Sequence, residues 1–294
     1  MASRPLFLDR SAGGLALSLV RSEADFARLH DEWPQSGVPF RSHEWLHTWW
    51  RHFGRTPARR ELAVLLARDR MGRLRGALAM YREHGPILRW ASLLGAGVSR
   101  HLGVAAAPAD QTEIAGAFAD ALRGALRARF IDGATFDGVD RTDPLWRGLP
   151  GMRPARFESG SRRRYHKPRL RGVELESLRA PQAIAAAFGD FVRLAHPRWT
   201  PELETFHRDA ALLCPTAELH FLLSRGRRRA ALLGLRAPER LLVCAHGGSR
   251  ILMGLLPHAA IAGGDACLRI VPAQGALRFF HAASVLYRLV KGAA

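Results

Sequence analysis

Two short phrases of this sequence occur twice, and in the same order. Residues 26–33 read FARLHDEW and residues 191–199 read FVRLAHPRW, while residues 61–68 read ELAVLLAR and residues 218–225 read ELHFLLSR. The copies are 165 residues apart at the first phrase and 157 at the second. A shortened loop explains the difference, because connections vary while the elements they join are kept. The repetition indicates an internal duplication, and chance similarity between leucine-rich segments is the alternative.

The length of the chain agrees with two copies of one fold. A chain of 294 residues exceeds one ordinary core, since domains average about 150 residues. With 48% hydrophobic and 24% charged residues, the composition is that of a globular protein. Residues 151–172 are poor in aliphatic residues and rich in arginine and glycine, as linkers are. We therefore expect one domain over residues 1–150, a basic linker over 151–172 and a second domain over 173–294.

The charge allows two interpretations. The net charge is +18, and only two of the 44 basic residues are lysines. The arginines are scattered through every segment, which favours a compositional bias over a surface built for a polyanion. The linker alone concentrates basic residues, namely Arg162, Arg163, Arg164, Lys167, Arg169 and Arg171. They form either a phosphate clamp or a solvated connection. We do not expect a nucleic-acid partner.

Cysteines and apolar runs exclude further classes. Cys214, Cys244 and Cys267 are odd in number and lack the C-x-x-C spacing of zinc or redox sites, so we expect buried small side chains and no metal. Neither a signal peptide nor an apolar run of membrane-spanning length is present. We expect a cytoplasmic protein, and peripheral contact with a membrane surface stays open.

Hydrophobic spacing predicts the same order of elements in both halves. The first half has a strand at 15–20, a helix carrying Phe26 on its apolar face, a helix from Ser42 to Gly54, strands at 61–67, 73–81 and 88–94, a helix at 112–129 and a strand at 130–139. The second half has a strand at 173–178, helices at 181–196 and 201–213, strands at 218–224, 228–236 and 240–246, and a strand at 276–282. The four tryptophans between Trp33 and Trp50 are expected in the core. Gly263, Gly264 and Asp265 precede a further predicted helix, as a pyrophosphate-binding turn or an ordinary N-cap.

This doubled order resembles a tandem GNAT acyltransferase fold. The segments PFRSHEWLHTWWRHFG (39–54), LLARDRMGRLRGALAMYR (65–82), LLGAG (93–97), FVRLAHPRW (191–199) and LRFFHAASVLYRLVKG (277–292) are similar to the CelD-like branch of FemAB-type acyltransferases, with their BioF2-like acetyltransferase domain. That family is associated with bacterial exopolysaccharide and cellulose biosynthesis. The resemblance implies an α/β (α+β) fold of two GNAT-like domains, each a mixed and mainly antiparallel sheet flanked by helices.

The resemblance also implies an activity and a site. The activity is acyl-CoA-dependent N-acyl transfer to an amino sugar or another cell-envelope precursor. Acyl-CoA is then a co-substrate, no cofactor is permanently bound, and a polysaccharide synthase is the expected partner. Tyr287 would be the general acid and His246 the base. Gly263, Gly264 and Asp265 would hold the co-substrate, and Arg198 and Trp199 the acceptor.

Other readings of these residues stay open. Tyr287 is alternatively a packed ring, and His246 an ordinary strand-end histidine. Where relatives carry an Asp after the glycine-rich turn, this chain has Ser99, Arg100 and His101. A catalytically degenerate GNAT-fold binding protein is therefore the alternative function, and a nucleic-acid-binding protein is the third.

Overall fold

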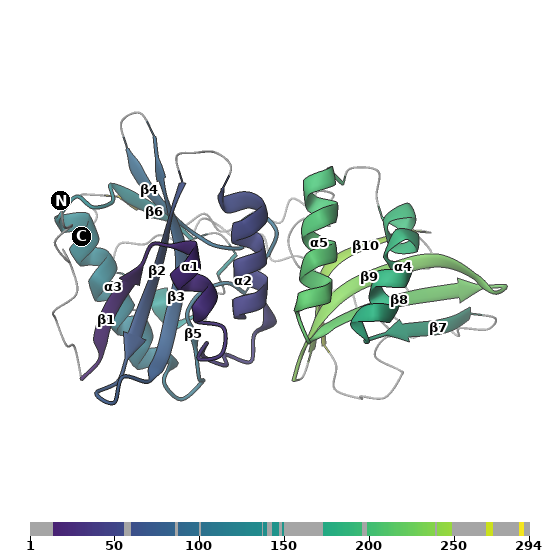
Figure 1. Ribbon diagram of the computed structural model, residues 1–294, viewed down its shortest axis with the longest axis horizontal. Coiled ribbons are helices and arrows are strands. Elements are labelled where there is room, and N and C mark those ends of the chain that lie inside the picture. Colours follow the sequence, from purple (N-terminus) through teal and green to yellow (C-terminus); the bar gives the residue numbers. More distant parts are fainter. Residues whose placement is uncertain are drawn as a thin grey trace. The chain divides into compact units, whose positions relative to one another are not determined.

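The computed structural model of the 294-residue chain describes residues 14–55, 60–85, 88–99, 101–136, 138–139, 143–146, 149, 173–195, 199–238, 240–248, 269–272 and 288–290. The chain divides into two compact units, one of residues 1–157 with 283–294, the other of residues 158–282. Figure 1 shows the elements of each unit along the chain.

The first unit is built on a mixed sheet of strand order β1-β2-β3-β4-β6-β12, with β5 paired to β3. All pairings are antiparallel except that of β4 with β6, which is parallel. The strands are β1 (Ala16–Val20), β2 (Arg60–Arg68), β3 (Leu74–His84), β4 (Arg89–Leu93), β5 (Ala105–Ala106), β6 (Gly133–Thr135) and β12 (Arg288–Val290). The helices are α1 (Glu23–Arg28), the 3-10 turn η1 (Pro39–Arg41), α2 (His43–Trp49), the π-helical turn η2 (Trp50–Gly54), α3 (Gln111–Arg127) and the 3-10 turn η3 (Pro144–Trp146).

β12 corrects one expectation from the sequence. The prediction placed residues 288–290 in the second domain, but this strand pairs with β6 and completes the first sheet. Strand pairing depends on contacts between segments far apart in the chain, which local periodicity does not report. The remaining predicted domain boundaries stay a prediction.

Two serine caps start the first two helices. The Ser22 hydroxyl accepts the N–H of Asp25 at 3.0 Å, and that of Ser42 accepts the N–H of Trp45 at 3.3 Å. Such caps satisfy backbone donors that have no partner inside the helix. At the end of η2, a Cβ on Gly54 would collide with the Trp50 indole, so only glycine lets the ring lie against this backbone.

Helices cover both faces of the first sheet (Figure 1). On one face Trp49 of α2 stacks on Tyr81 of β3, with ring centroids 5.5 Å apart. On the other face α3 packs with Ile114 directly over Gly76, where any side chain would clash. The four tryptophans predicted for the core are buried, which confirms that prediction: Trp33, Trp45, Trp49 and Trp50.

The second unit repeats this arrangement with the strand order β11-β10-β9-β8-β7. Its elements are β7 (Val173–Leu178), α4 (Pro181–Leu194), α5 (Pro201–Leu213), β8 (Ala217–Ser224), β9 (Arg227–Ala237), β10 (Arg240–Gly248) and β11 (Arg269–Pro272). Only the pairing of β10 with β11 is parallel. Arg228 identifies the face that α4 covers, because its guanidinium lies 4.2 Å over the Phe221 ring and pairs with Asp190 of α4 at 2.5 Å.

The repeated phrases occupy matching elements. ELAVLLAR lies in β2 and ELHFLLSR in β8, each the second strand of its sheet, between the first and the third. In the other phrase, Phe26 meets Trp33 at 5.6 Å and Phe191 meets Trp199 at 5.3 Å between ring centroids. The duplication and the predicted fold class, tandem mainly antiparallel sheets flanked by helices, are confirmed.

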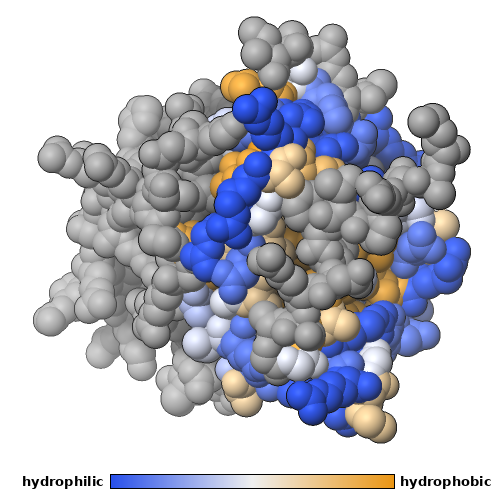
Figure 2. All heavy atoms as spheres, turned by 90° about the vertical axis from the view of Figure 1, so that its left-hand side faces the viewer, coloured by the Kyte–Doolittle hydropathy of each residue, from blue (hydrophilic) through white to orange (hydrophobic). Residues whose placement is uncertain are grey.

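Partly exposed arginines pair with carboxylates of their own unit. Arg75 lies 2.7 Å from Asp110, and Arg68 lies 2.6 Å from Glu32. On the face of the first unit shown in Figure 2, hydrophilic residues make up much of the coloured surface. Part of the large positive charge is therefore neutralised locally.

Candidate functional site

One of three register shifts in the described sheets is a β-bulge within β10. The register with β9 runs from Arg240↔Ala237 to Val243↔Gly234 and resumes one residue later at Ala245↔Leu233. Cys244 is therefore the extra residue. Bulges bend the strand and re-aim its groups, and they are frequent beside active sites.

The parallel neighbour of β10 ends where this bulge begins. β11 pairs with residues 240–243 of β10, and its register stops at Val243↔Pro272. Beyond that point β9 continues along one edge of β10 to Gly248, while β11 no longer follows the other edge. Among the described residues, no strand therefore pairs with β10 beyond Val243 on this edge, which we call the opening of β10.

The end of α4 contacts β10 at Gly247 and closes this opening there. Ala195 forms a bridge with Gly247, and it must use the edge on the β11 side because β9 occupies the other. The approach is so close that a Cβ on Gly247 would overlap the Leu194 carbonyl. Among the residues that the structure describes, the opening therefore spans residues 244–246. Backbone amides along such an edge can bind an extended ligand as an added strand or stabilise a developing oxyanion.

His246 lies at this opening, as the sequence predicted for a strand end. Its side chain is half-buried, and burial lowers its pKa, so the imidazole is neutral at pH 7 and able to accept a proton. The cross-strand register places Ser177, His220, Leu232 and His246 in one row across β7, β8, β9 and β10. Directly opposed residues share a face, so all four are on one face.

The position of Phe221 shows on which face of the sheet this row lies. Phe221, next to His220 on β8, is on the face that α4 covers. Because successive strand residues alternate between faces, His220 and His246 lie on the face opposite α4.

Most other predicted site residues lie outside the described residues. This holds for Tyr287, Gly263, Gly264, Asp265 and Arg198, and for the basic run 161–171. Trp199 is described, and its ring stacks on His207 at 4.7 Å while meeting Phe191 edge-on. These contacts show packing, and a role of Trp199 in binding an acceptor stays a proposal.

The corresponding strand of the first unit is built differently. β4 pairs with β3 from Met80↔Leu93 to His84↔Arg89 without a register shift, and β6 runs beside it through Ser92↔Thr135. Hence the bulge of β10 has no counterpart in β4.

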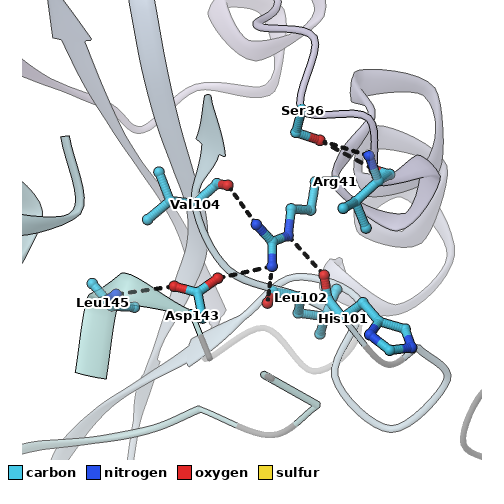
Figure 3. Close-up of polar contacts among 8 residues, drawn as sticks. Ser36, Arg41, His101, Leu102, Val104, Asp143 and Leu145 are labelled. Carbon is cyan, nitrogen blue, oxygen red and sulfur yellow. Dashed lines mark hydrogen bonds and ion pairs between the residues drawn. The ribbon is translucent and has the colours of Figure 1, made fainter. Parts of the chain in front are cut away.

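The guanidinium of Arg41 is hydrogen-bonded to the loop that follows β4 (Figure 3). Arg41 donates to the carbonyls of His101 at 2.7 Å, Val104 at 3.0 Å and Leu102 at 3.2 Å. Its Nη2 also pairs with Asp143 at 2.8 Å, and both side chains are buried. Arg41 was part of a segment that carried the family resemblance, but nothing local marked it as a buried ion-pair partner.

Two surface hollows lie among the described residues. One, about 760 Å³, lies between β7, α4 and the β8–β9 hairpin, and its Arg228 is already paired with Glu176 and Asp190. The other, about 340 Å³, lies at the start of α3, where Asp110 is paired with Arg75.

The described residues give no support to two further kinds of site. Among them, no group of three or more His, Cys, Asp or Glu is arranged to hold a metal ion. In the same part of the chain, no helix has the length and apolarity needed to cross a bilayer. Cys214 and Cys244 are buried, as expected.

This chain is similar to solved structures at low sequence identity. The sequence matches no family profile and no curated protein. Among solved structures, a tandem GNAT protein from the clavulanic acid biosynthesis pathway is 12% identical, covers 95% of this chain and 99% of its own, and has a TM-score of 0.40. FemX is 13% identical over 84% of this chain and 83% of its own, with a TM-score of 0.48.

A third similar structure is the C-terminal domain of a putative lysylphosphatidylglycerol synthetase from Agrobacterium fabrum. It is 12% identical, covers 92% of both chains and has a TM-score of 0.46. Because these TM-scores lie below 0.5, the fold assignment rests on the strand order and pairing alone, which give two mainly antiparallel sheets flanked by helices in tandem.

Proposed function

We propose that this protein is an acyl-CoA-dependent N-acyltransferase whose thioester binds along the opening of β10. The observation that carries the proposal is the coincidence of the Cys244 bulge with the end of the β11 pairing. In the part of the chain that the structure describes, no neighbouring strand pairs with residues 244–246 on this edge. An acyl donor with an amide-containing arm can add to such an edge as a strand does.

The reaction needs few side chains at this site. An amine attacks the thioester carbonyl, a C–N bond forms, the C–S bond breaks and the thiolate leaves. Backbone N–H groups at the bulge would stabilise the oxyanion. The neutral imidazole of His246 accepts the proton of the amine, and in our proposal Tyr287 returns a proton to the thiolate.

The finer assignments belong to the same proposal. The acceptor is an amino sugar or another cell-envelope precursor, with Arg198 and Trp199 at its subsite and Gly263, Gly264 and Asp265 at the phosphates of the donor. A polysaccharide synthase is the proposed partner and the cytoplasm the proposed location. These assignments follow from the family resemblance of the sequence.

Acetyl-CoA binding and thiol release test the proposal. Acetyl-CoA should raise the melting temperature of the protein, since a ligand that binds the native state stabilises it. Free thiol should appear when an amino sugar is added. Polysaccharide fragments and an oligonucleotide, each at two salt concentrations, are the comparison ligands.

Each alternative function has its own outcome in this experiment. Stabilisation by a polysaccharide without thiol release would show the binding-protein alternative. Stabilisation by the oligonucleotide that weakens steeply with salt would show nucleic-acid binding. Either result, without any effect of acetyl-CoA, contradicts the acyltransferase proposal.

A further inference from the structure

Three side chains on β7 and β8 form a continuous polar chain outside the opening of β10. The Ser177 hydroxyl lies 2.8 Å from Nδ1 of His220, and Nε2 of His220 lies 3.1 Å from Oε2 of Glu218. Ser177 and His220 are direct cross-strand partners, while Glu218 and His220 are two apart on β8 and share a face. Sequence reasoning did not single out any of the three.

The ionisation state of Glu218 orients this chain. Burial by itself would raise the pKa of Glu218, but hydrogen bonds from His220 and Arg236 lower it to about 2. Arg236 Nη2 lies 2.7 Å and Arg179 Nε 3.0 Å from the carboxylate. The group is therefore an ionised carboxylate at neutral pH, and a carboxylate only accepts hydrogen bonds.

An ionised Glu218 selects one tautomer of His220. To donate to the carboxylate, Nε2 must carry the proton, and in the neutral ring Nδ1 then holds a lone pair. Nδ1 faces the Ser177 hydroxyl, so the hydroxyl donates to it. A serine that donates to a carboxylate-oriented imidazole is the arrangement of an activated nucleophile.

Of the three hydrogen-bonded side chains, only Ser177 is exposed. Glu218 is 3% exposed and His220 is 1% exposed, whereas Ser177 is an exposed residue. A reactive group can therefore meet the hydroxyl but not the imidazole or the carboxylate. The row that contains Ser177 and His220 continues to His246 at the opening of β10, on the same face of the sheet.

The described part of the first unit has no such row of hydrogen-bonded side chains at the matching place. Glu61 begins the repeated phrase as Glu218 does, and it pairs with Arg82 at 2.5 Å and with His84 at 3.0 Å. However, β2 has Ala63 where β8 has His220. A Glu–Arg pair thus belongs to both copies, and the imidazole that joins a carboxylate to a serine belongs to the second.

We propose that Ser177 is a nucleophile that accepts an acyl group from an activated ester or thioester, with His220 as its base. In this step the Ser177 Oγ bonds to the acyl carbon and its proton moves to Nδ1 of His220. The bond from the acyl carbon to the leaving oxygen or sulfur breaks, and the leaving group takes that electron pair and then the proton. Glu218 stabilises the transient imidazolium as a positioning residue.

A fluorophosphonate probe tests the proposal on the intact protein without any thioester. Attack by an activated serine forms an O–P bond, fluoride leaves, and the phosphonate ester persists for mapping by peptide mass spectrometry. Ser224 at the end of β8 is the internal control, because it lies on the same sheet and is not part of the chain. Ser177 should be labelled ~10²-fold or more faster than Ser224.

Two variants separate activation from simple accessibility. Ser177→Ala should abolish labelling, while Ser224→Ala should leave it unchanged. His220→Gln keeps a donor toward Glu218 but has no basic nitrogen that can take the Ser177 proton, so labelling of Ser177 should fall to the rate of Ser224. Circular dichroism and thermal unfolding check that this variant folds.

Two results would overturn the proposal. One is labelling of Ser177 no faster than that of Ser224 in the unaltered protein, which decides the matter even when His220→Gln does not fold. The other is equally fast labelling of Ser177 in a folded His220→Gln variant. Neither depends on whether the protein transfers acyl groups from acyl-CoA.

Discussion

At the scale of single residues, His246 is the side chain on which the proposed reaction most depends. Burial lowers its pKa, so it remains an unprotonated base to lower pH than an ordinary histidine. Thiol release should therefore persist below pH ~6.5 and fall only as the pH drops through the lowered pKa. His246→Ala should reduce turnover by ~10²-fold or more, measured as initial rates of thiol release.

The matched control for His246 is another histidine at a strand end. His84 ends β3 of the first unit, and His84→Ala should leave turnover unchanged. Equal turnover in both variants would show that His246 is a packed strand-end residue and not the base.

Arg41 should contribute more to stability than any exposed arginine. Arg41→Met leaves Asp143 buried without its cation and removes donors from three carbonyls. Breaking a buried ion pair costs about 3–5 kcal/mol, which urea denaturation should show. Arg28→Met is the control, because Arg28 and Asp25 are 76% and 51% exposed and such a pair contributes under ~1 kcal/mol. Similar losses in both variants would contradict the structural role of Arg41.

Glu218 should make the protein sensitive to acid. Its folded-state pKa of about 2 lies below the unfolded value of ~4.3, so its contribution is present above pH ~4.3 and is lost as the pH falls toward 2. The difference corresponds to about 3 kcal/mol. Glu218→Gln should lower stability at pH 7 and flatten its decline between pH 5 and 2. Parallel stability curves for the two proteins would contradict this assignment.

At the scale of elements, the contact between the end of α4 and β10 sets the length of the opening. A methyl group on Gly247 would overlap the Leu194 carbonyl, so Gly247→Ala should push the two segments apart. We expect a loss of about 1–3 kcal/mol and weaker stabilisation by acetyl-CoA, both measured by thermal unfolding.

Gly189→Ala is the control within the same helix. A Cβ at Gly189 meets no atom within 4 Å, and alanine favours a helix interior by roughly 0.5–1 kcal/mol over glycine. This variant should be neutral or stabilising. If Gly247→Ala behaves like it, the close approach does not shape the site.

At the scale of the whole molecule, two compact units imply two cores that can be perturbed separately. Phe26 and Phe191 occupy matching positions, and neither ring is exposed. Phe26→Ala should lower the free energy of unfolding of the first unit, and Phe191→Ala that of the second, each by about 3–5 kcal/mol. Calorimetry should show each loss as a lower melting temperature of the corresponding unit. One shared transition that both variants lower equally would show a single cooperative unit.

The duplication, the order of elements and the tryptophan core of the first unit could be predicted from the sequence. The duplication shows as phrases repeated along the chain, and the other two features depend on residues a few positions apart: Phe26 with Trp33, or Ser42 with the amide of Trp45. Local patterns were less accurate for lengths, because α1 ends at Arg28 and β6 spans only Gly133–Thr135 of the predicted strand. Tyr287 and the Gly263–Asp265 turn lie outside the described residues and stay predictions.

Only the tertiary structure decided where the candidate chemistry lies. The Cys244 bulge is defined by the register of β10 with β9 and by the end of β11. Arg41 and Asp143 are 102 residues apart in the chain, and Ser177 and His220 are 43 apart. A local pattern specifies which face of an element is apolar, but which distant residues become neighbours is set by strand register and packing.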